Sequence, residues 1–317
     1  MRPDEKGKIK RHLPELVFFA LFIGCIWFLY GIQGNAQDVA SRGRSALLWM
    51  VSRWEGCGGD LSFGWIIPLV SAFVIWQKRK DLAAAPKQTD ATGLIIIVLS
   101  LLLHWLGYRA QLTRLSLLSL IGLLWGVFFT LHGRQVAKLL VFPCAYLVFC
   151  IPLSFLNNIT VPLRILASSI STDLLNGLGI GAVRSGTIIH SLAAGGFNFD
   201  VADACSGLRS LLAMTALTAV YAYQTQKKLW QQWMLFVAAI PLAIVGNIFR
   251  ILTIALVAQG FGQERAMTMY HYLSGFLVFA VAILLMIGLG ELLKINYVEK
   301  LKKWKAKNIN TMSPSSV

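Results

Sequence analysis

Charged residues are scarce in this sequence. They make up 14% of its 317 residues, and hydrophobic residues make up 56%, whereas an average soluble domain carries about 25% charged residues. Several nearly uncharged runs have the length of roughly 17 to 25 residues that a helix needs to cross an apolar layer about 30 Å thick. The shortage of charge therefore excludes an ordinary water-soluble domain and predicts a membrane protein with several spans.

Cysteine pairs are also missing. The five cysteines form no CxxC pair of the kind that binds zinc, and their odd number does not indicate a disulfide framework. Cys25, Cys144 and Cys150 fall inside apolar runs, where a thiol acts as a small hydrophobic group. Only Cys57 and Cys205 fall in segments that we expect to be accessible, and we predict neither a metal nor another cofactor.

Apolar runs of spanning length are what the sequence has instead. They lie near residues 13–32, 63–76, 93–108, 115–131, 139–155, 204–223, 233–257 and 272–293. The sequence therefore predicts an all-α polytopic membrane protein with about eight transmembrane helices. We expect one membrane domain over residues 1–308 and a disordered tail at 309–317.

Lysine is absent from alternate loops. With both termini cytoplasmic, every lysine and 19 of the 29 basic residues fall in inner segments, whereas the outer segments hold eight arginines. Because lysine and arginine bias sets the orientation of membrane proteins, this pattern predicts cytoplasmic termini. The net charge of +15 comes from these same basic loop residues. We therefore expect the protein to contact membrane lipids rather than nucleic acid.

One outer segment, between the fifth and sixth spans, is too long for a simple turn. Its first half, 161–178, predicts an amphipathic helix that packs on the membrane surface through residues at helical spacing. These residues are Leu166, Ile170 and Leu174. Its second half, 184–203, predicts a β-hairpin of two short strands around an Ala-Gly-Gly turn. The hairpin leads directly into the sixth span.

Three polar segments interrupt the apolar pattern at the predicted outer ends of spans: DACSGLRS, GNIFR and YHYLSG. Ionisable side chains are costly within a membrane, so each segment is a functional candidate. Cys205 begins the sixth span and His271 directly precedes the eighth. Arg250 lies about 17 residues, or roughly 26 Å, into the seventh. We therefore expect the three residues at one depth.

These positions suit thiol chemistry. Asp203 is placed to cap the sixth helix, which leaves Cys205 in the first turn, where unpaired backbone N–H groups and the helix dipole favour a thiolate. His271 could exchange protons with the thiol and a leaving amine, because imidazole titrates near neutrality. Arg250 could support the thiolate, hold a developing oxyanion or position His271. The predicted supporting residues flank this trio or share a helix face with it: Asp203, Ser206, Arg209 and Asn247.

The same segments resemble the exosortase/archaeosortase family of membrane transpeptidases. The resemblance rests on VADACSGLRSL around Cys205, on AIPLAIVGNIFRI around Arg250 and on HYLSG beginning at His271, in the family's order. Weaker similarity extends to LSFGWIIPLVSAFVIW in the second span and to FPCAYLVFCIPL in the fifth. The family often has a histidine before the glycine of the second span, where this chain has Phe63.

The resemblance implies a cysteine transpeptidase that removes C-terminal sorting signals from exported proteins. Such a signal joins a short recognition motif, a transmembrane helix and a basic cluster. Cys205 would be the nucleophile, His271 the acid and base, and Arg250 the third catalytic residue. The implied location is a bacterial cytoplasmic (inner) membrane, with the site on its outer face and the exported proteins as partners.

Two other functions fit the same residues. A multi-span transporter or channel could line its substrate path with Arg209, Arg250 and His271, and it would keep its function after Cys205→Ala. A membrane thioacyl transferase acting on lipid donors would need the thiol but would carry a lipid acyl group. Trapping the covalent adduct would separate this function from peptide cleavage.

Overall fold

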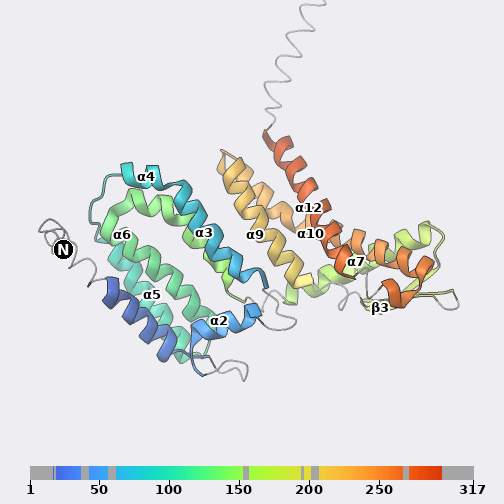
Figure 1. Ribbon diagram of the computed structural model, residues 1–317, viewed down its shortest axis with the longest axis horizontal. Helices are drawn as coiled ribbons and strands as arrows, with labels where there is room; N and C mark the ends of the chain where they lie inside the picture. The colour runs from blue at the N-terminus through green and yellow to red at the C-terminus, as the bar shows by residue number, and fades with distance from the viewer. Residues whose placement is uncertain are drawn as a thin grey trace, which may run out of the picture. The chain divides into compact units, whose positions relative to one another are not determined.

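The computed structural model describes residues 17, 19–36, 43–55, 62–152, 157–193, 196–200, 207–266 and 271–294 (Figure 1). The chain folds into two compact units, Met1–Ser154 and Phe155–Val317. A single membrane domain over residues 1–308 stays a prediction. The second unit carries all three predicted catalytic residues.

The described elements of the first unit are all helical. They are η1 (Trp27–Ile32), α2 (Ala46–Glu55), η2 (Ser62–Trp65), α3 (Ile66–Gln77), α4 (Arg79–Ala84), α5 (Thr92–Arg109), α6 (Thr113–Tyr146) and η3 (Leu147–Cys150). Trp54 Nε1 donates a hydrogen bond of 3.0 Å to the Cys150 carbonyl oxygen, which fastens α2 to the end of η3.

Small residues let α5 and α6 pack closely. A Cβ atom added to Gly107 of α5 would lie 2.8 Å from Ser116 Oγ, and one added to Gly122 of α6 would lie 2.5 Å from Ser100 Oγ. Glycine and serine at such crossings are typical of membrane helix pairs, because they let the two backbones approach. With a link of only three residues, 110–112, the two helices form a tight antiparallel pair.

The long helix α6 folds back on itself at Gly133. This residue has φ 82° and ψ −179°, a conformation that is essentially restricted to glycine. Trp125 Nε1 donates to the Ala137 carbonyl oxygen at 2.9 Å, although a straight helix would place these residues about 18 Å apart along its axis. Arg114 Nε likewise donates to the Pro152 carbonyl oxygen at 2.7 Å. The chain must therefore reverse direction at Gly133, so that the residues after α6 lie near its first turn.

Three helices within the described residues are long and apolar enough to cross a membrane: Thr92–Arg109, Thr113–Cys150 and Leu229–Phe261. Because the second folds back at Gly133, it covers two of the predicted spans, those near 115–131 and 139–155. Two shorter apolar helices, Phe19–Ile32 and Phe63–Gln77, coincide with the predicted first and second spans. The protein is a multi-pass membrane protein, whereas the count of eight spans and their orientation stay predictions.

The second unit combines helices with a small sheet. Its elements are α7 (Asn157–Gly177), β1 (Ala182–Ser185), β2 (Ile188–Ser191), β3 (Asn198–Asp200), α9 (Gly207–Thr225), α10 (Leu229–Phe261), α11 (Gln263–Arg265) and α12 (His271–Lys294). The strands form one antiparallel sheet in the order β1-β2-β3, with Ile189 opposite Phe199.

The prediction of a two-stranded hairpin was incomplete. Its two strands and their Ala-Gly-Gly connection correspond to β2 and β3, but β1 adds a third strand in front of them. Gly186 makes this possible, because its φ of 66° lets the chain reverse within a two-residue turn between Ser185 and Ile188. The sequence analysis placed the residues on both sides of Gly186 in a single strand.

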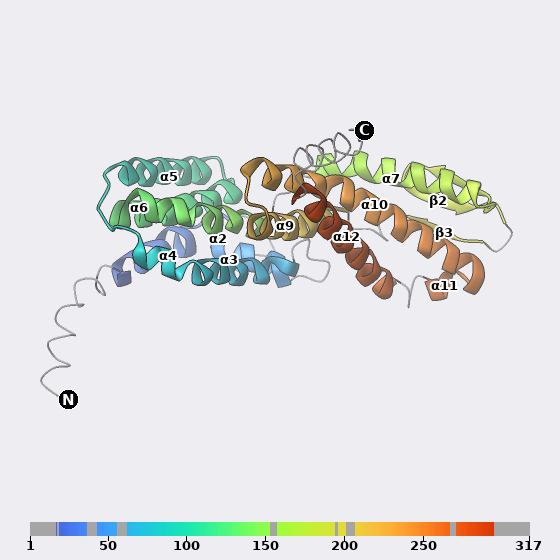
Figure 2. The same ribbon diagram turned by 90° about the horizontal axis from the view of Figure 1, so that it is seen from above.

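The helix predicted over residues 161–178 is present as α7. Its Ala167 and Leu175 are buried in a cluster with the sheet and with α10, whereas Leu166 and Leu174 are exposed. Figure 2 shows α7 lying along α10 with β2 and β3 beside them. Two of the three residues of the predicted apolar stripe are therefore exposed, and the third, Ile170, is partly buried; contact of this face with a membrane surface stays a prediction.

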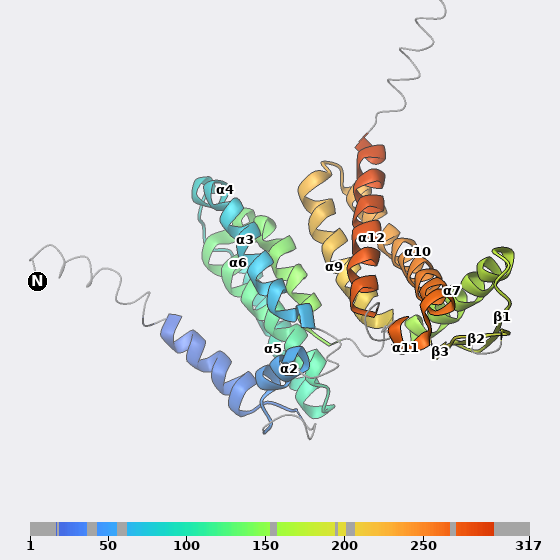
Figure 3. The same cartoon turned by 45° about the vertical axis from the view of Figure 1, so that its right-hand side comes forward.

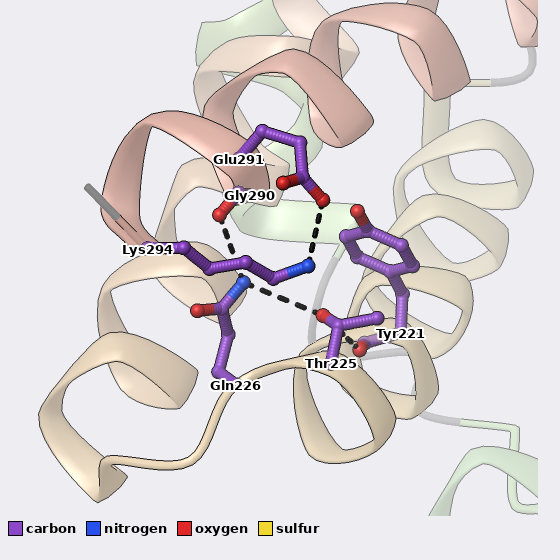
Figure 4. Close-up of polar contacts among 6 residues, drawn as sticks. All are labelled: Tyr221, Thr225, Gln226, Gly290, Glu291 and Lys294. Carbon is purple, nitrogen blue, oxygen red and sulfur yellow. Dashed lines mark hydrogen bonds and ion pairs between the residues drawn. The ribbon is translucent and has the colours of Figure 1, made fainter.

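Helices α9, α10 and α12 form a bundle (Figure 3). At one end Gln226 Nε2, in the link between α9 and α10, donates to the Gly290 carbonyl oxygen of α12 at 3.0 Å (Figure 4). Gln231 Nε2 of α10 donates at 2.6 Å to the carbonyl oxygen of Leu293, which lies in the last helical turn and so lacks a partner within α12. Helix α12 therefore runs parallel to α9 and antiparallel to α10.

Candidate functional site

Three of the seven predicted site residues lie outside the described residues: Asp203, Cys205 and Ser206. Arg209 lies in the first turn of α9 and His271 is the first residue of α12, and the structure describes their backbone only. Asn247 and Arg250 lie in α10 with both side chains partly buried. Direct contact among Cys205, Arg250 and His271 stays a prediction.

The bundle brings the helix ends that carry these residues to one end of the second unit. Leu211 of α9, Ala243 of α10 and Ala282 of α12 belong to one buried cluster and mark a common level. At 1.5 Å per residue, Gly207 lies about 6 Å beyond this level, Arg250 about 10 Å and His271 about 16 Å, all in the same direction. The start of α9, Arg250 and the start of α12 therefore lie within about 10 Å of one another along the bundle.

We predict that Arg250 lies near the far edge of the membrane layer that α10 crosses. It follows Leu229, the first residue of α10, by about 32 Å of helix, and the hydrocarbon layer is about 30 Å thick. The Thr253 hydroxyl donates to the Arg250 carbonyl oxygen at 2.9 Å, one turn farther along. A guanidinium keeps its charge and carries five donors, so at this depth Arg250 can hold an anion while lying at the membrane boundary.

The short strand β3 is anchored next to Arg250. Phe199 of β3 is 3% exposed and belongs to the cluster formed with Ile251 and Ile254 of α10. Phe197, directly before β3, is buried in the same cluster, and its ring centroid lies 5.4 Å from that of Phe199. The residues that lead toward Cys205 thus start from the segment of α10 that directly follows Arg250.

Gln263 of α11 holds this strand from the other side. Its Nε2 donates to the Asn198 carbonyl oxygen at 2.6 Å, and its Oε1 accepts from the Asn198 backbone N–H at 3.0 Å. One side chain therefore satisfies both backbone groups of a β3 residue. The contact joins the strand before Cys205 to the helical turn before His271.

A small hollow lies between α7, α9 and α10. Its floor is apolar, and its polar lining consists of Thr160 and Arg164 from α7 and Asn247 from α10. Asn247 therefore takes part in this hollow together with an arginine from another helix. The Arg164 Nε is buried and has no hydrogen-bond partner among the residues that the structure describes.

The sequence analysis missed Gln263 and Arg164. Arg164 entered it only as one of eight basic residues of the outer segments, and Gln263 not at all. No local signal distinguishes either residue, because each gains its environment from an element distant in sequence. The three described cysteines, Cys25, Cys144 and Cys150, are free thiols of the first unit.

The comparison with family models adds independent evidence. The model of the transmembrane exosortase family matches residues 54–288, which includes the segments around Cys205, Arg250 and His271. Searches of curated proteins and of solved structures found no match. Since the family model covers well over half of a multi-pass helical chain, this protein belongs to the transmembrane exosortase family.

Proposed function

We propose that this protein is a membrane cysteine transpeptidase that removes C-terminal sorting signals from exported proteins. The observation that carries the proposal is the family match. The bundle also supports it, because the start of α9, Arg250 and the start of α12 lie toward the same end. Its partners would be exported proteins that end in a recognition motif, a transmembrane helix and a basic cluster. The site would face the outside of a bacterial cytoplasmic membrane.

The reaction begins with the Cys205 thiolate. Its sulfur attacks the carbonyl carbon of the scissile peptide bond, and a tetrahedral oxyanion forms. His271 in its protonated form gives its proton to the departing amine, so that the C–N bond breaks and the C-terminal helix leaves as a free amine. A thioacyl enzyme remains. An amine or water then attacks it, His271 takes the proton from this nucleophile, and the thiolate is released.

Arg250 has three possible tasks in this scheme. A guanidinium near the thiol would favour the thiolate, one near the carbonyl oxygen would stabilise the oxyanion, and one beside the imidazole would orient His271. Its place at the edge of the apolar layer supports all three, because electrostatic attraction is stronger where water is scarce. The anchoring of β3 against Ile251 supports a short separation between Arg250 and the chain that leads to Cys205.

The decisive experiment compares the C-termini of exported proteins in cells with and without Cys205. In Cys205→Ala, exported proteins with a C-terminal transmembrane segment should keep that segment, and processing should fall by about 10³-fold or more. Mass spectrometry of their C-termini measures the loss and identifies the cleavage site.

The matched control is Cys57→Ala, the other cysteine outside the apolar runs, and it should process normally. Normal C-termini in Cys205→Ala would exclude the thiol mechanism and favour a transporter or channel. A trapped adduct on Cys205 that carries a lipid acyl group would instead identify a thioacyl transferase.

A further inference from the structure

The hollow beside α10 changes from apolar to polar along the direction in which α10 crosses the membrane. Its lining along α10 begins at Ile240, passes Ala243 and Ile244, and ends at Asn247. From Leu229, the start of α10, Ile240 lies about 16 Å along the helix and Asn247 about 27 Å. In a layer about 30 Å thick, the apolar end is therefore near the middle and the polar end near the boundary.

The lining from α7 contributes an arginine that has no ion-pair partner among the described residues. This residue is Arg164, and its buried Nε has no described hydrogen-bond partner. Asn247 and Thr160 also line the hollow. A guanidinium fork matches phosphate oxygens, and basic pockets between membrane helices bind lipid head groups for this reason.

The neighbouring surface is suited to acyl chains. Val161 and Ile165, which flank the polar lining residues of α7 in sequence, are exposed, and so is Ile240 at the apolar end of the hollow. An occupant must therefore place an anion near the membrane boundary and extend an apolar chain toward its middle. A phospholipid has this form, whereas a free anion would leave the apolar floor unused.

We infer that this hollow binds a phospholipid of the leaflet opposite Lys227 and Lys228, with its phosphate at Arg164 and Asn247 and one acyl chain over Ile240 and Ile244. Asn247 is also a predicted supporting residue of the thiol site, but the inference does not depend on the thiol chemistry and holds whether or not Cys205 is a nucleophile. The phosphate of such a lipid would give the Arg164 guanidinium a counter-charge, and its acyl chain would cover the apolar lining residues.

The test uses the purified full-length protein in a detergent without phosphate. Dioleoylphosphatidylglycerol should raise its Tm in a saturable way, and dioleoylphosphatidylethanolamine should do the same because it shares the phosphodiester. Dioleoylglycerol, with the same chains and no phosphate, and inorganic phosphate alone should not. Arg164→Gln should weaken the apparent Kd for phosphatidylglycerol about tenfold or more.

Two further variants keep the test decisive. Arg164→Lys retains the charge and most of the side chain but loses the fork, so it should fold and bind with intermediate affinity. Arg184→Gln is the matched control, because Arg184 is exposed on β1 and its side chain donates to the Gly186 carbonyl oxygen of the adjacent turn; it should bind like the unchanged protein.

Four outcomes would overturn the inference. An equal shift with dioleoylglycerol would show that the hollow holds an acyl chain only, and an equal shift with inorganic phosphate would show a free-anion site. Unchanged affinity in both Arg164 variants would remove the arginine from the site. A shift with a synthetic C-terminal sorting peptide but with neither phospholipid would identify a peptide site instead.

Discussion

Arg250 has three proposed tasks, and its place in the fold is compatible with each of them. It shares α10 with Ile251, which is fully buried against the cluster that contains Phe199, so its backbone has little freedom to move. A guanidinium on a fixed backbone can act on the thiolate or on the oxyanion, and these two tasks have different pH signatures. The side chain can therefore be assigned by kinetics.

The prediction for Arg250 separates the two tasks. If Arg250 supports the thiolate, Arg250→Gln should move the pH midpoint of Cys205 alkylation by a small maleimide upward by about one unit or more. If it instead holds the oxyanion or orients His271, the alkylation profile should stay unchanged while peptide cleavage falls by about 10²-fold or more. Measuring both rates from pH 5 to pH 9 decides between them, and normal cleavage in this variant would remove Arg250 from the mechanism.

At the scale of elements, the site depends on how β3 and α11 are held. The sheet is small, with four, four and three residues in its strands, and so short a sheet needs packing against a helix for stability. Buried Phe199 supplies that packing on α10, and Gln263 supplies two hydrogen bonds to the backbone of β3. We therefore regard Gln263 as a positioning residue.

Gln263→Leu should lower kcat for cleavage by about tenfold while KM changes little, because a misplaced nucleophile is penalised mainly in the reaction step. Asn198→Ala is the matched control. Gln263 bonds to the backbone of residue 198, so this variant keeps both contacts and should react normally. Equal loss of kcat in both variants would mean that kcat depends on the side chains of β3 and not on the hydrogen bonds from Gln263.

The opposite end of the bundle fixes the register of α12. Gly290 lies so close to α9 that an added Cβ would be 2.8 Å from Tyr221 Cε1. Gln226 donates to the Gly290 carbonyl oxygen (Figure 4), and Gln231 donates to that of Leu293. A slip by one helical turn would move His271 by about 5.4 Å. The level of His271 is therefore set from the far end of its own helix.

Replacing either glutamine should destabilise this end of the bundle. In Gln226→Leu or Gln231→Leu a buried carbonyl group loses its donor, so the free energy of unfolding should fall by about 1 kcal/mol in each variant. Reversible unfolding in mixed micelles measures the change. Gln224→Leu, at an exposed position of α9, is the control, and an equal loss there would contradict the role of the two hydrogen bonds.

At the scale of the whole molecule, the orientation in the membrane determines where the chemistry takes place. Lysines are confined to one set of predicted loops, and the sheet belongs to the opposite set. The sheet packs on the far half of α10, through Ile251 and Ile254. Ile251 lies about 33 Å along α10 from Leu229, the residue that follows Lys228. The sheet and Lys228 should therefore face opposite sides.

Labelling in intact cells tests this orientation. In a chain with Cys57→Ser and Cys205→Ser, Val183→Cys should react with an impermeant maleimide, because Val183 is exposed on β1. Lys228→Cys, exposed in the link between α9 and α10, should react only after the membrane is permeabilised. The reverse pattern would invert the predicted topology and place the candidate site in the cytoplasm.

The sequence by itself determined the class of the protein and the segments that carry its candidate chemistry. Hydropathy and polar interruptions are local properties, so apolar runs near 115–131 and 139–155, the surface helix α7 and the segment of Arg250 could be read from neighbouring residues. The family resemblance rested on the same local segments, and the match over residues 54–288 confirms it.

Only the tertiary structure decided which distant residues meet. The third strand, the hydrogen bonds from Gln263 to β3 and the hollow lined by Arg164 and Asn247 all join segments from different elements. A side chain such as Gln263 has the same sequence neighbours whether it is solvated or bonded to a strand. Its role therefore follows from packing, because burial and hydrogen bonding are set by the whole fold and not by the adjacent residues.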